Sequence, residues 1–203
     1  MAIPLEQLEA KLTEARRLYP DVERSMRLRG AILQHALQKN PQAPTGGDYM
    51  YRHKRTQWRC RVRVTPTGLT THALMWWWHG PEAYRNEALD AILLRGHNFP
   101  LHFDSHFWGR WGLRTEVMGV KLTNLMGFFK QYPDLPMRQG KRFYPAQPEF
   151  AAAIDQGLVF GRLNGKRIIS CDTFKGLDMF SPEERQLWEK LRKKDAHRID
   201  HTR

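Results

Sequence analysis

The stretch WRCRVRVTPTGLTTHALMWWW, residues 58–78, predicts a β-hairpin and so defines the β part of the fold. In its first half, apolar residues alternate strictly with arginines, which is typical of a half-buried strand. Pro66 and Gly68 supply a turn, and residues 69–78 return as the second strand. A second hairpin is predicted for LVFGRLNGKRIISCDTF, residues 158–174, because the Asn-Gly pair in its middle is the strongest short-range hairpin signal.

Helices are predicted before, between and after the two hairpins. Apolar residues at helical spacing predict one helix over residues 4–19 and another over 22–39, with Pro20 separating them. Two further helices are expected, one over residues 81–96 and one from Asp104, its N-cap, to about Gln131. One or two helical turns are expected in residues 148–157.

A closing helix is predicted from a capping box, in which Ser181 is the N-cap, Pro182 takes the first helical position and Glu184 completes the motif. We therefore expect an α+β protein with N-terminal helices, followed by two antiparallel β-hairpin-bearing parts with intervening helices. Its segments are a helical region (1–40), a basic hairpin with a helix (49–96), a second α+β part with the other hairpin (101–180) and a helix with a tail (181–203). We expect them to pack as one unit.

Net charge is the unusual feature of the composition. The 203 residues are 41% hydrophobic and 27% charged, as in ordinary globular proteins, but 33 Lys and Arg oppose 21 Asp and Glu, a net charge of +12. Such a charge attracts polyanions, so nucleic acid, RNA before DNA, is the expected partner, and an anionic membrane surface is the lesser one.

The sequence has no secretory signal and no apolar run of roughly 18 residues, so we expect a cytoplasmic protein without a membrane span. Cys60 and Cys171 are too few for a zinc ribbon, and a single disulfide between them stays open.

The basic hairpin is the first candidate binding surface. Residues 49–81 contain no acidic residue. Arginines on one strand face can follow a phosphate backbone, and aromatic rings can stack on unpaired bases. The expected nucleic-acid-binding residues are Arg52, Lys54, Arg55, Trp58, Arg59, Arg61 and Arg63. A row of arginines repels itself unless acids from elsewhere face it, so the acidic surface of a partner protein is the competing interpretation.

The stretch HFDSHFWGRWGLR, residues 102–114, is the candidate for catalysis. On a helix from Asp104, His106, Arg110 and Arg114 share one face. RNA cleavage without a metal needs proton transfer, which histidine performs near neutral pH, and cations that hold the phosphoryl oxygens, for which arginine is suited. Two alternatives stay open: a solvated basic helix face, or a metal held by His102, Asp104 and His106 on an extended segment.

FDSHFWGRWGLR, followed by RQGKRFYP and GLVFGRLNGKRIISCDTF, resembles the small RelE/barnase-like ribonuclease toxin domains over residues 101–174. The resemblance implies a metal-independent ribonuclease without a cofactor, with an inhibitor protein as a possible partner. It implies His106, Arg110 and Arg114 as catalytic residues, joined by Thr173 or Ser170 near the last strand. The alternatives are a non-catalytic RNA- or DNA-binding protein, and a phage or mobile-element factor that docks on an acidic host protein.

Overall fold

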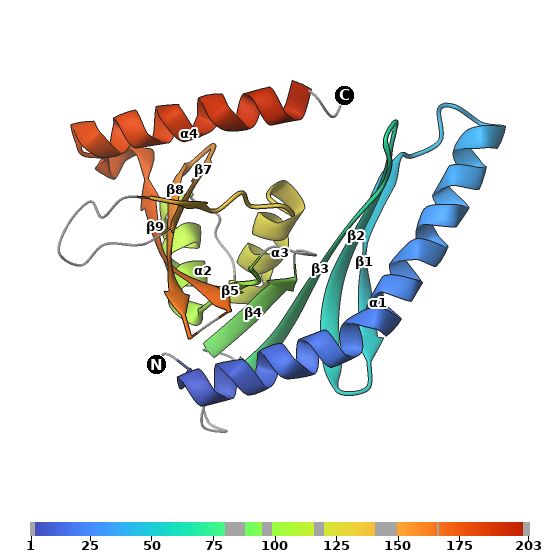
Figure 1. Ribbon diagram of the computed structural model, residues 1–203, viewed down its shortest axis with the longest axis horizontal. Coiled ribbons are helices and arrows are strands. Elements are labelled where there is room, and N and C mark those ends of the chain that lie inside the picture. Colours follow the sequence, from blue (N-terminus) through green and yellow to red (C-terminus); the bar gives the residue numbers. More distant parts are fainter. Residues whose placement is uncertain are drawn as a thin grey trace.

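The computed structural model describes residues 3–79, 88–94, 99–115, 120–140, 150–165 and 167–200, with side chains as far as residue 195. Within these ranges the chain forms four α-helices and nine strands, which confirms the predicted α+β class (Figure 1). The helices are α1 (Leu5–Lys39), α2 (Ser105–Arg114), α3 (Lys121–Gln131) and α4 (Pro182–Asp200), with a short 3-10 helix at Leu177–Met179. The strands are β1 (Gly46–His53), β2 (Thr56–Thr65), β3 (Gly68–His79), β4 (Ala88–Leu94), β5 (Leu101–Phe103), β6 (Arg138–Gln139), β7 (Phe150–Ile154), β8 (Gly157–Asn164) and β9 (Ile168–Gly176).

The strands form one sheet in the order β1-β2-β3-β4-β5-β9-β8-β7-β6. Both predicted hairpins are confirmed, as β2–β3 and β8–β9. All neighbouring strands are antiparallel except β5 and β9, which pair in parallel with His102 opposite Ser170. This pairing joins the two hairpin-bearing parts and places the stretch at residues 101–103 beside the last strand.

Helices cover both sides of the sheet. α2 and α3 bury a cluster that contains Phe103, Trp111 and Phe128 against one side. On the other side α1 covers β2 and β3, and α4 covers β7 and β8, at opposite ends. The strand register shows that α1 and α4 lie on the same side of the sheet. Ile168, which packs with the residues under α1, pairs with Asn164 of β8. Asn164 is four residues after Phe160, which packs under α4, and residues an even number apart in a strand point to the same side. On this same side the central strands carry polar side chains: His102 on β5 pairs with Ile92 of the α1 cluster on one side and with Ser170 of β9 on the other.

The prediction of two N-terminal helices is wrong, because α1 runs through Pro20 without a break. A proline inside a helix costs about 3 kcal/mol. The buried stripe continues on both sides of it, from Leu8 and Leu18 to Val22 and Met26, all packed on the sheet. Burial of that stripe outweighs the cost, and the helix bends in its middle (Figure 1).

Two other predicted helical segments are strands. Residues 88–94 form β4, and the rest of the predicted helix at 81–96, residues 81–87 and 95–96, lies outside the described residues. Residues 150–154 form β7 in place of helical turns. A central strand is covered on both sides, so its sequence is a continuous apolar run that periodicity cannot distinguish from a helix.

The helix predicted over residues 104–131 is two helices, α2 and α3. Its start is confirmed, because the Asp104 side chain caps α2. The closing helix and its capping box are also confirmed: the backbone N–H of Ser181 donates to Glu184 Oε2 (2.7 Å), and that of Glu184 donates to Ser181 Oγ (3.3 Å).

Cys60 and Cys171 are buried in different core clusters and form no disulfide. Among the described residues, no helix is long and apolar enough to cross a membrane.

Two glycines of α2 predict opposite effects of alanine. A Cβ at Gly112 would lie 2.2 Å from Nδ2 of Asn124, a buried group that donates to the Trp108 carbonyl, so Gly112→Ala should destabilise the fold by roughly 1–3 kcal/mol. A Cβ at Gly109 meets nothing within 4 Å, so Gly109→Ala should stabilise the helix by about 0.5–1 kcal/mol. Urea denaturation of both variants measures the difference, and equal effects would contradict the close α2–α3 packing.

Candidate functional site

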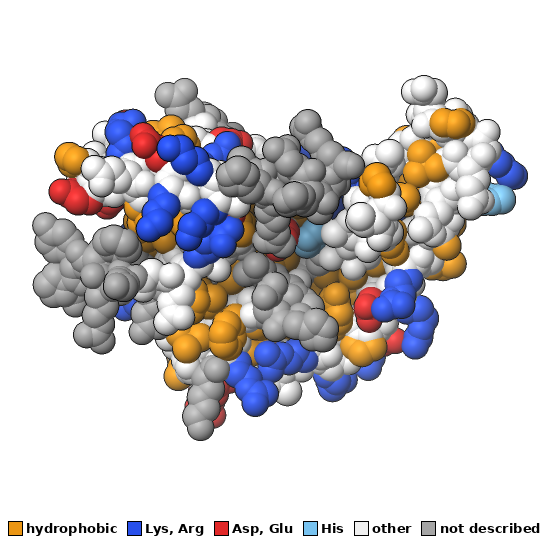
Figure 2. Space-filling view, turned by 45° about the horizontal axis from the view of Figure 1, so that its top comes forward, with side chains coloured by type: hydrophobic (Ala, Val, Ile, Leu, Met, Phe, Trp, Pro, Cys, Tyr) orange, Lys and Arg blue, Asp and Glu red, His pale blue; other side chains and the backbone are white. Residues whose placement is uncertain are grey.

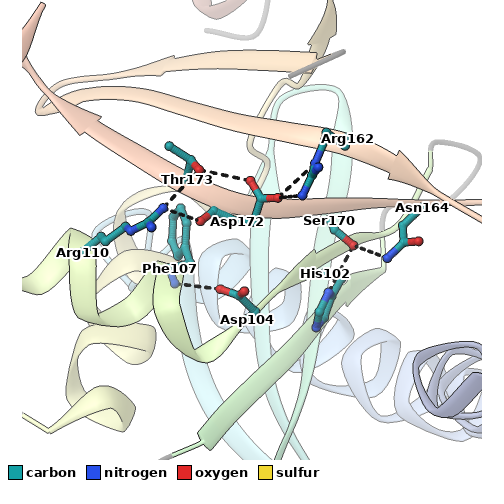
Figure 3. A network of polar contacts seen from close by, with 9 residues as sticks. All are labelled: His102, Asp104, Phe107, Arg110, Arg162, Asn164, Ser170, Asp172 and Thr173. Carbon is teal, nitrogen blue, oxygen red and sulfur yellow. Dashed lines mark hydrogen bonds and ion pairs between the residues drawn. The ribbon is translucent and has the colours of Figure 1, made fainter. Parts of the chain in front are cut away.

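Three polar residues of β9, namely Ser170, Asp172 and Thr173, form a group that we call the β9 row (Figure 3). The strand is irregular here: Cys171 pairs with Gly161 and Thr173 with Phe160, so Asp172 has no partner residue on β8. A β-bulge of this kind redirects side chains locally. Asp172 therefore does not follow the regular alternation of side chains along β9. Its carboxylate contacts Arg162 of β8, and its carbonyl contacts Arg110 of α2.

Asp172 is the centre of the β9 row. Its Oδ2 accepts hydrogen bonds from Nε (3.2 Å) and Nη2 (2.7 Å) of Arg162 on β8, and its Oδ1 accepts one from the Thr173 hydroxyl (3.2 Å). The Arg162 side chain is 65% exposed and that of Asp172 is 26% exposed. The pair therefore lies at the surface, within reach of a ligand.

Arg110 approaches the same residues from α2. β5 ends at Phe103, so β9 has no strand beside it on that edge beyond Cys171. Arg110 Nη1 donates there to the Asp172 carbonyl (3.1 Å) and to Thr173 Oγ1 (3.2 Å). Figure 3 shows Arg110 and Arg162 on either side of Asp172. Of the predicted catalytic residues, the structure thus brings Arg110 and Thr173 into contact.

The other two predicted helix residues lie on the same helix, one turn to each side. His106 is exposed one turn before Arg110. Arg114 is half-buried one turn after it, and its Cβ is 3.7 Å from the position a Cβ would take at Gly176, at the end of β9. Helix α2 therefore places Arg110 and Arg114 along the open edge of β9, and the exposed imidazole of His106 lies one turn earlier on the same helix.

The alternative of a metal at His102, Asp104 and His106 is wrong. The chain changes from strand to helix after Phe103, so the three side chains do not share a side. His102 bonds within the sheet, the Asp104 carboxylate accepts the N–H of Phe107 (2.8 Å), and His106 is exposed. Burial raises the pKa of Asp104, although the Phe107 bond and the charge of His102 oppose the change. Within the described ranges, no group of three His, Cys, Asp or Glu side chains could hold a metal ion.

A buried polar network, not foreseen from the sequence, lies next to the β9 row. The Asp90 carboxylate on β4, 1% exposed, is 3.0 Å from Nε2 of His102 and 2.9 Å from Nε2 of His79. It also accepts the backbone N–H of Ser105 (3.2 Å). His102 Nδ1 is in turn 3.3 Å from Ser170 Oγ. A lone acidic residue inside the apolar run ALDAILL was the available signal.

Asp90 stays ionised in this network. Burial by itself raises the pKa of its carboxyl, but the hydrogen bonds and charges of His102 and His79 outweigh burial and lower the pKa below its usual range. Although Ser170, His102 and Asp90 follow the order of a nucleophilic triad, the His102 ring is 4% exposed and stacked on Trp77. We interpret the network as a brace that positions the strands beside the β9 row.

The arginine row of β2 has a partner within the chain. Asp48 of β1 lies opposite Arg61, and its carboxylate is 3.0 Å from Arg59 Nη2 and 3.5 Å from Arg61 Nε. Arg61 Nη1 also donates to the Lys130 carbonyl in the last turn of α3, where a cation is favourable. These two arginines therefore hold β1 and α3 in place.

Trp58 does not fit its predicted role in stacking on bases. It is 0% exposed in the α1 cluster, and its Nε1 donates to Thr56 Oγ1 (2.9 Å), so its ring has no face for a base. Side chains alternate between the two faces of β2, so the face opposite Arg59 carries Trp58 into the core. The exposed members of the predicted surface are Arg52, Lys54, Arg55 and Arg63. On the face of the molecule that Figure 2 shows, basic side chains lie in separate groups, one of them over α4.

Comparison with known proteins gave no match: no model of a protein family, no curated protein and no solved structure is significantly similar to this chain.

Replacing the buried carboxylate should destabilise the fold strongly. We expect Asp90→Asn to lower the free energy of unfolding at pH 7 by about 3–5 kcal/mol, because the variant leaves His79 and His102 without their charged partner. The lowered pKa of Asp90 adds stability above the pKa of an unfolded aspartate, about 3.9, which is lost as the pH falls through the folded-state value. The difference between wild type and variant should therefore shrink below about pH 4.

Asp21→Asn is the matched control for urea denaturation at both pH values. Asp21 also faces a histidine, His53 at 3.4 Å, but its side chain is 42% exposed, so the change should stay under about 1 kcal/mol. Equal losses in the two variants would show that the Asp90 network does not stabilise the sheet.

Proposed function

We propose that this protein is a metal-independent, RNA-cleaving enzyme of the toxin-like kind, acting in the cytoplasm, with its active surface where α2 runs along β9. The observation that carries the proposal is the contact of Arg110 with the carbonyl of Asp172 and the hydroxyl of Thr173. It places a fixed cation, a hydroxyl and a half-buried carboxylate together, one helical turn from the exposed imidazole of His106.

The reaction needs two proton transfers. A base removes the proton of the ribose 2′-hydroxyl, and the resulting oxygen attacks phosphorus. The bond from phosphorus to the 5′-oxygen then breaks as an acid protonates that oxygen, and the products are a 2′,3′-cyclic phosphate and a 5′-hydroxyl end. In the proposal His106 performs one transfer and the carboxylate of Asp172 the other.

The cations stabilise the charge that builds on the phosphoryl oxygens. Arg110 is held by two acceptors on β9, so its guanidinium needs little reorganisation when substrate binds. Arg162 lies across Asp172 from it and supplies a second cation, and Arg114 one turn away binds the neighbouring phosphate. Thr173 acts by orienting Arg110.

His106→Ala tests the assignment. We expect the purified wild type to cleave total RNA in the presence of EDTA and to leave cyclic phosphate ends, and the variant to be slower by roughly 10²–10⁴-fold with unchanged RNA binding. His35→Ala is the control, because His35 is an exposed histidine on α1. The proposal would be overturned if neither wild type nor the two variants cleaved RNA, or if cleavage by wild type required a metal ion. Intact RNA that still shifts on a gel would favour a non-catalytic nucleic-acid-binding protein.

We expect two arginines of β2, Arg63 and Arg61, to have different roles, one in RNA binding and the other in the stability of the fold. Arg63 is exposed, so Arg63→Gln should weaken RNA binding and reduce its salt dependence without changing the stability of the fold. Arg61→Gln should instead lower the free energy of unfolding by about 1–2 kcal/mol, because Arg61 contacts Asp48 and the end of α3. Gel shifts at several salt concentrations and urea denaturation measure the two effects. If Arg63→Gln binds RNA as wild type does, β2 is not part of the RNA surface.

A further inference from the structure

A cavity of about 560 Å³ lies between the N-terminal half of α1 and the ends of β2 and β3. Its size is within the range of small-molecule sites. Its lining includes Lys11 and Glu14 of α1, Arg55 of the β1–β2 turn, and Trp77, Trp78 and His79 of β3. Aromatic rings and cations thus meet in one hollow, away from the β9 row.

The indole of Trp77, which packs on the α1 side of the sheet, lacks a hydrogen-bond acceptor. Its Nε1 is buried and has no partner among the described residues. A buried N–H without an acceptor is costly, and tryptophan normally finds one. The unmet donor indicates that a ligand with acceptor atoms completes the site.

The charges of the cavity favour an anion. Lys11 and Arg55 are its fixed cations, and Glu14 is its only fixed anion among the lining residues described. Glu14 is already 2.8 Å from Lys11, whose Nζ also lies 5.8 Å above the ring of Trp77. Arg55 is exposed at the β1–β2 turn and can reach a bound group. The surplus positive charge is suited to a phosphate.

The cavity wall is also held in advance of binding. Trp77 is stacked on His102 with the ring centroids 6.4 Å apart, and His79 is fixed at 2.9 Å from Asp90. A ligand that enters therefore orders few side chains, which reduces the entropy lost on binding.

We propose that this cavity binds a nucleoside phosphate, with an acceptor atom of the base at the indole N–H of Trp77 and the phosphate at Lys11 and Arg55. A base with acceptor atoms matches the unmet indole N–H, and the phosphate matches the cations. The same chemistry is offered by a free mononucleotide and by an unpaired nucleotide of an RNA chain. The site does not depend on RNA cleavage at the β9 row.

Titration calorimetry of the full chain with AMP, adenosine and inorganic phosphate tests the proposal. AMP should bind more tightly than either of its parts. The double variant Lys11→Gln/Arg55→Gln should weaken AMP binding by about tenfold or more, because charge-assisted contacts are lost. Trp77→Phe keeps an aromatic wall but removes one N–H, so it should weaken binding by roughly fivefold.

Lys39→Gln, at the other end of α1, should bind AMP as wild type does, because Lys39 does not line the cavity. AMP contains no internucleotide bond, so this assay and RNA cleavage can fail independently. No AMP binding, equal affinity for AMP and inorganic phosphate, or wild-type affinity in both cavity variants would overturn the proposal. Competition between AMP and an oligoribonucleotide distinguishes the two ligands. If the oligoribonucleotide displaces AMP at a much lower nucleotide concentration than AMP itself needs, the ligand is RNA. If it does not, the ligand is the free nucleotide.

Discussion

Asp90 places a negative charge near the centre of the nine-stranded sheet, where only 1% of the residue is exposed. A charge so deeply buried is tolerated only when it is paired, and Asp90 is paired with His79 on β3, His102 on β5 and the first residue of α2. These contacts tie three strands to the start of α2. The position of α2 therefore depends on this carboxylate, and so does the contact of Arg110 on α2 with Asp172 and Thr173 on β9.

The layering of helices then decides where chemistry is possible. α1 and α4 cover one side of the sheet at its two ends, and α2 and α3 bury the other side. The polar residues of the β9 row lie on a central strand, next to the open edge that Arg110 of α2 contacts. The candidate active surface and the tryptophan-lined cavity are therefore different parts of the molecule, joined by the chain of contacts from Ser170 through His102 and Asp90 to His79.

Much of the local structure could be predicted from the sequence. Strict alternation identified β2, the Asn-Gly pair identified β8–β9, and capping residues identified the starts of α2 and α4. The predictions failed where burial overrides local preference: α1 continues through Pro20, and residues 88–94 form a strand because both of their faces are covered. Arg110 and Thr173 could be singled out, but Asp172 and Asp90 could not, because their importance depends on contacts between distant strands.

By itself the sequence determined the α+β class, the net charge of +12 and the face of α2 that carries His106, Arg110 and Arg114, since these follow from composition and short-range periodicity. Only the tertiary structure decided which of these groups meet. The parallel pairing of β5 with β9 brings His102 and Ser170, separated by 68 positions, into contact. The pairing of β1 with β2 places Asp48 against Arg59 and Arg61. Such pairings depend on how the whole sheet buries its faces, which no short stretch encodes.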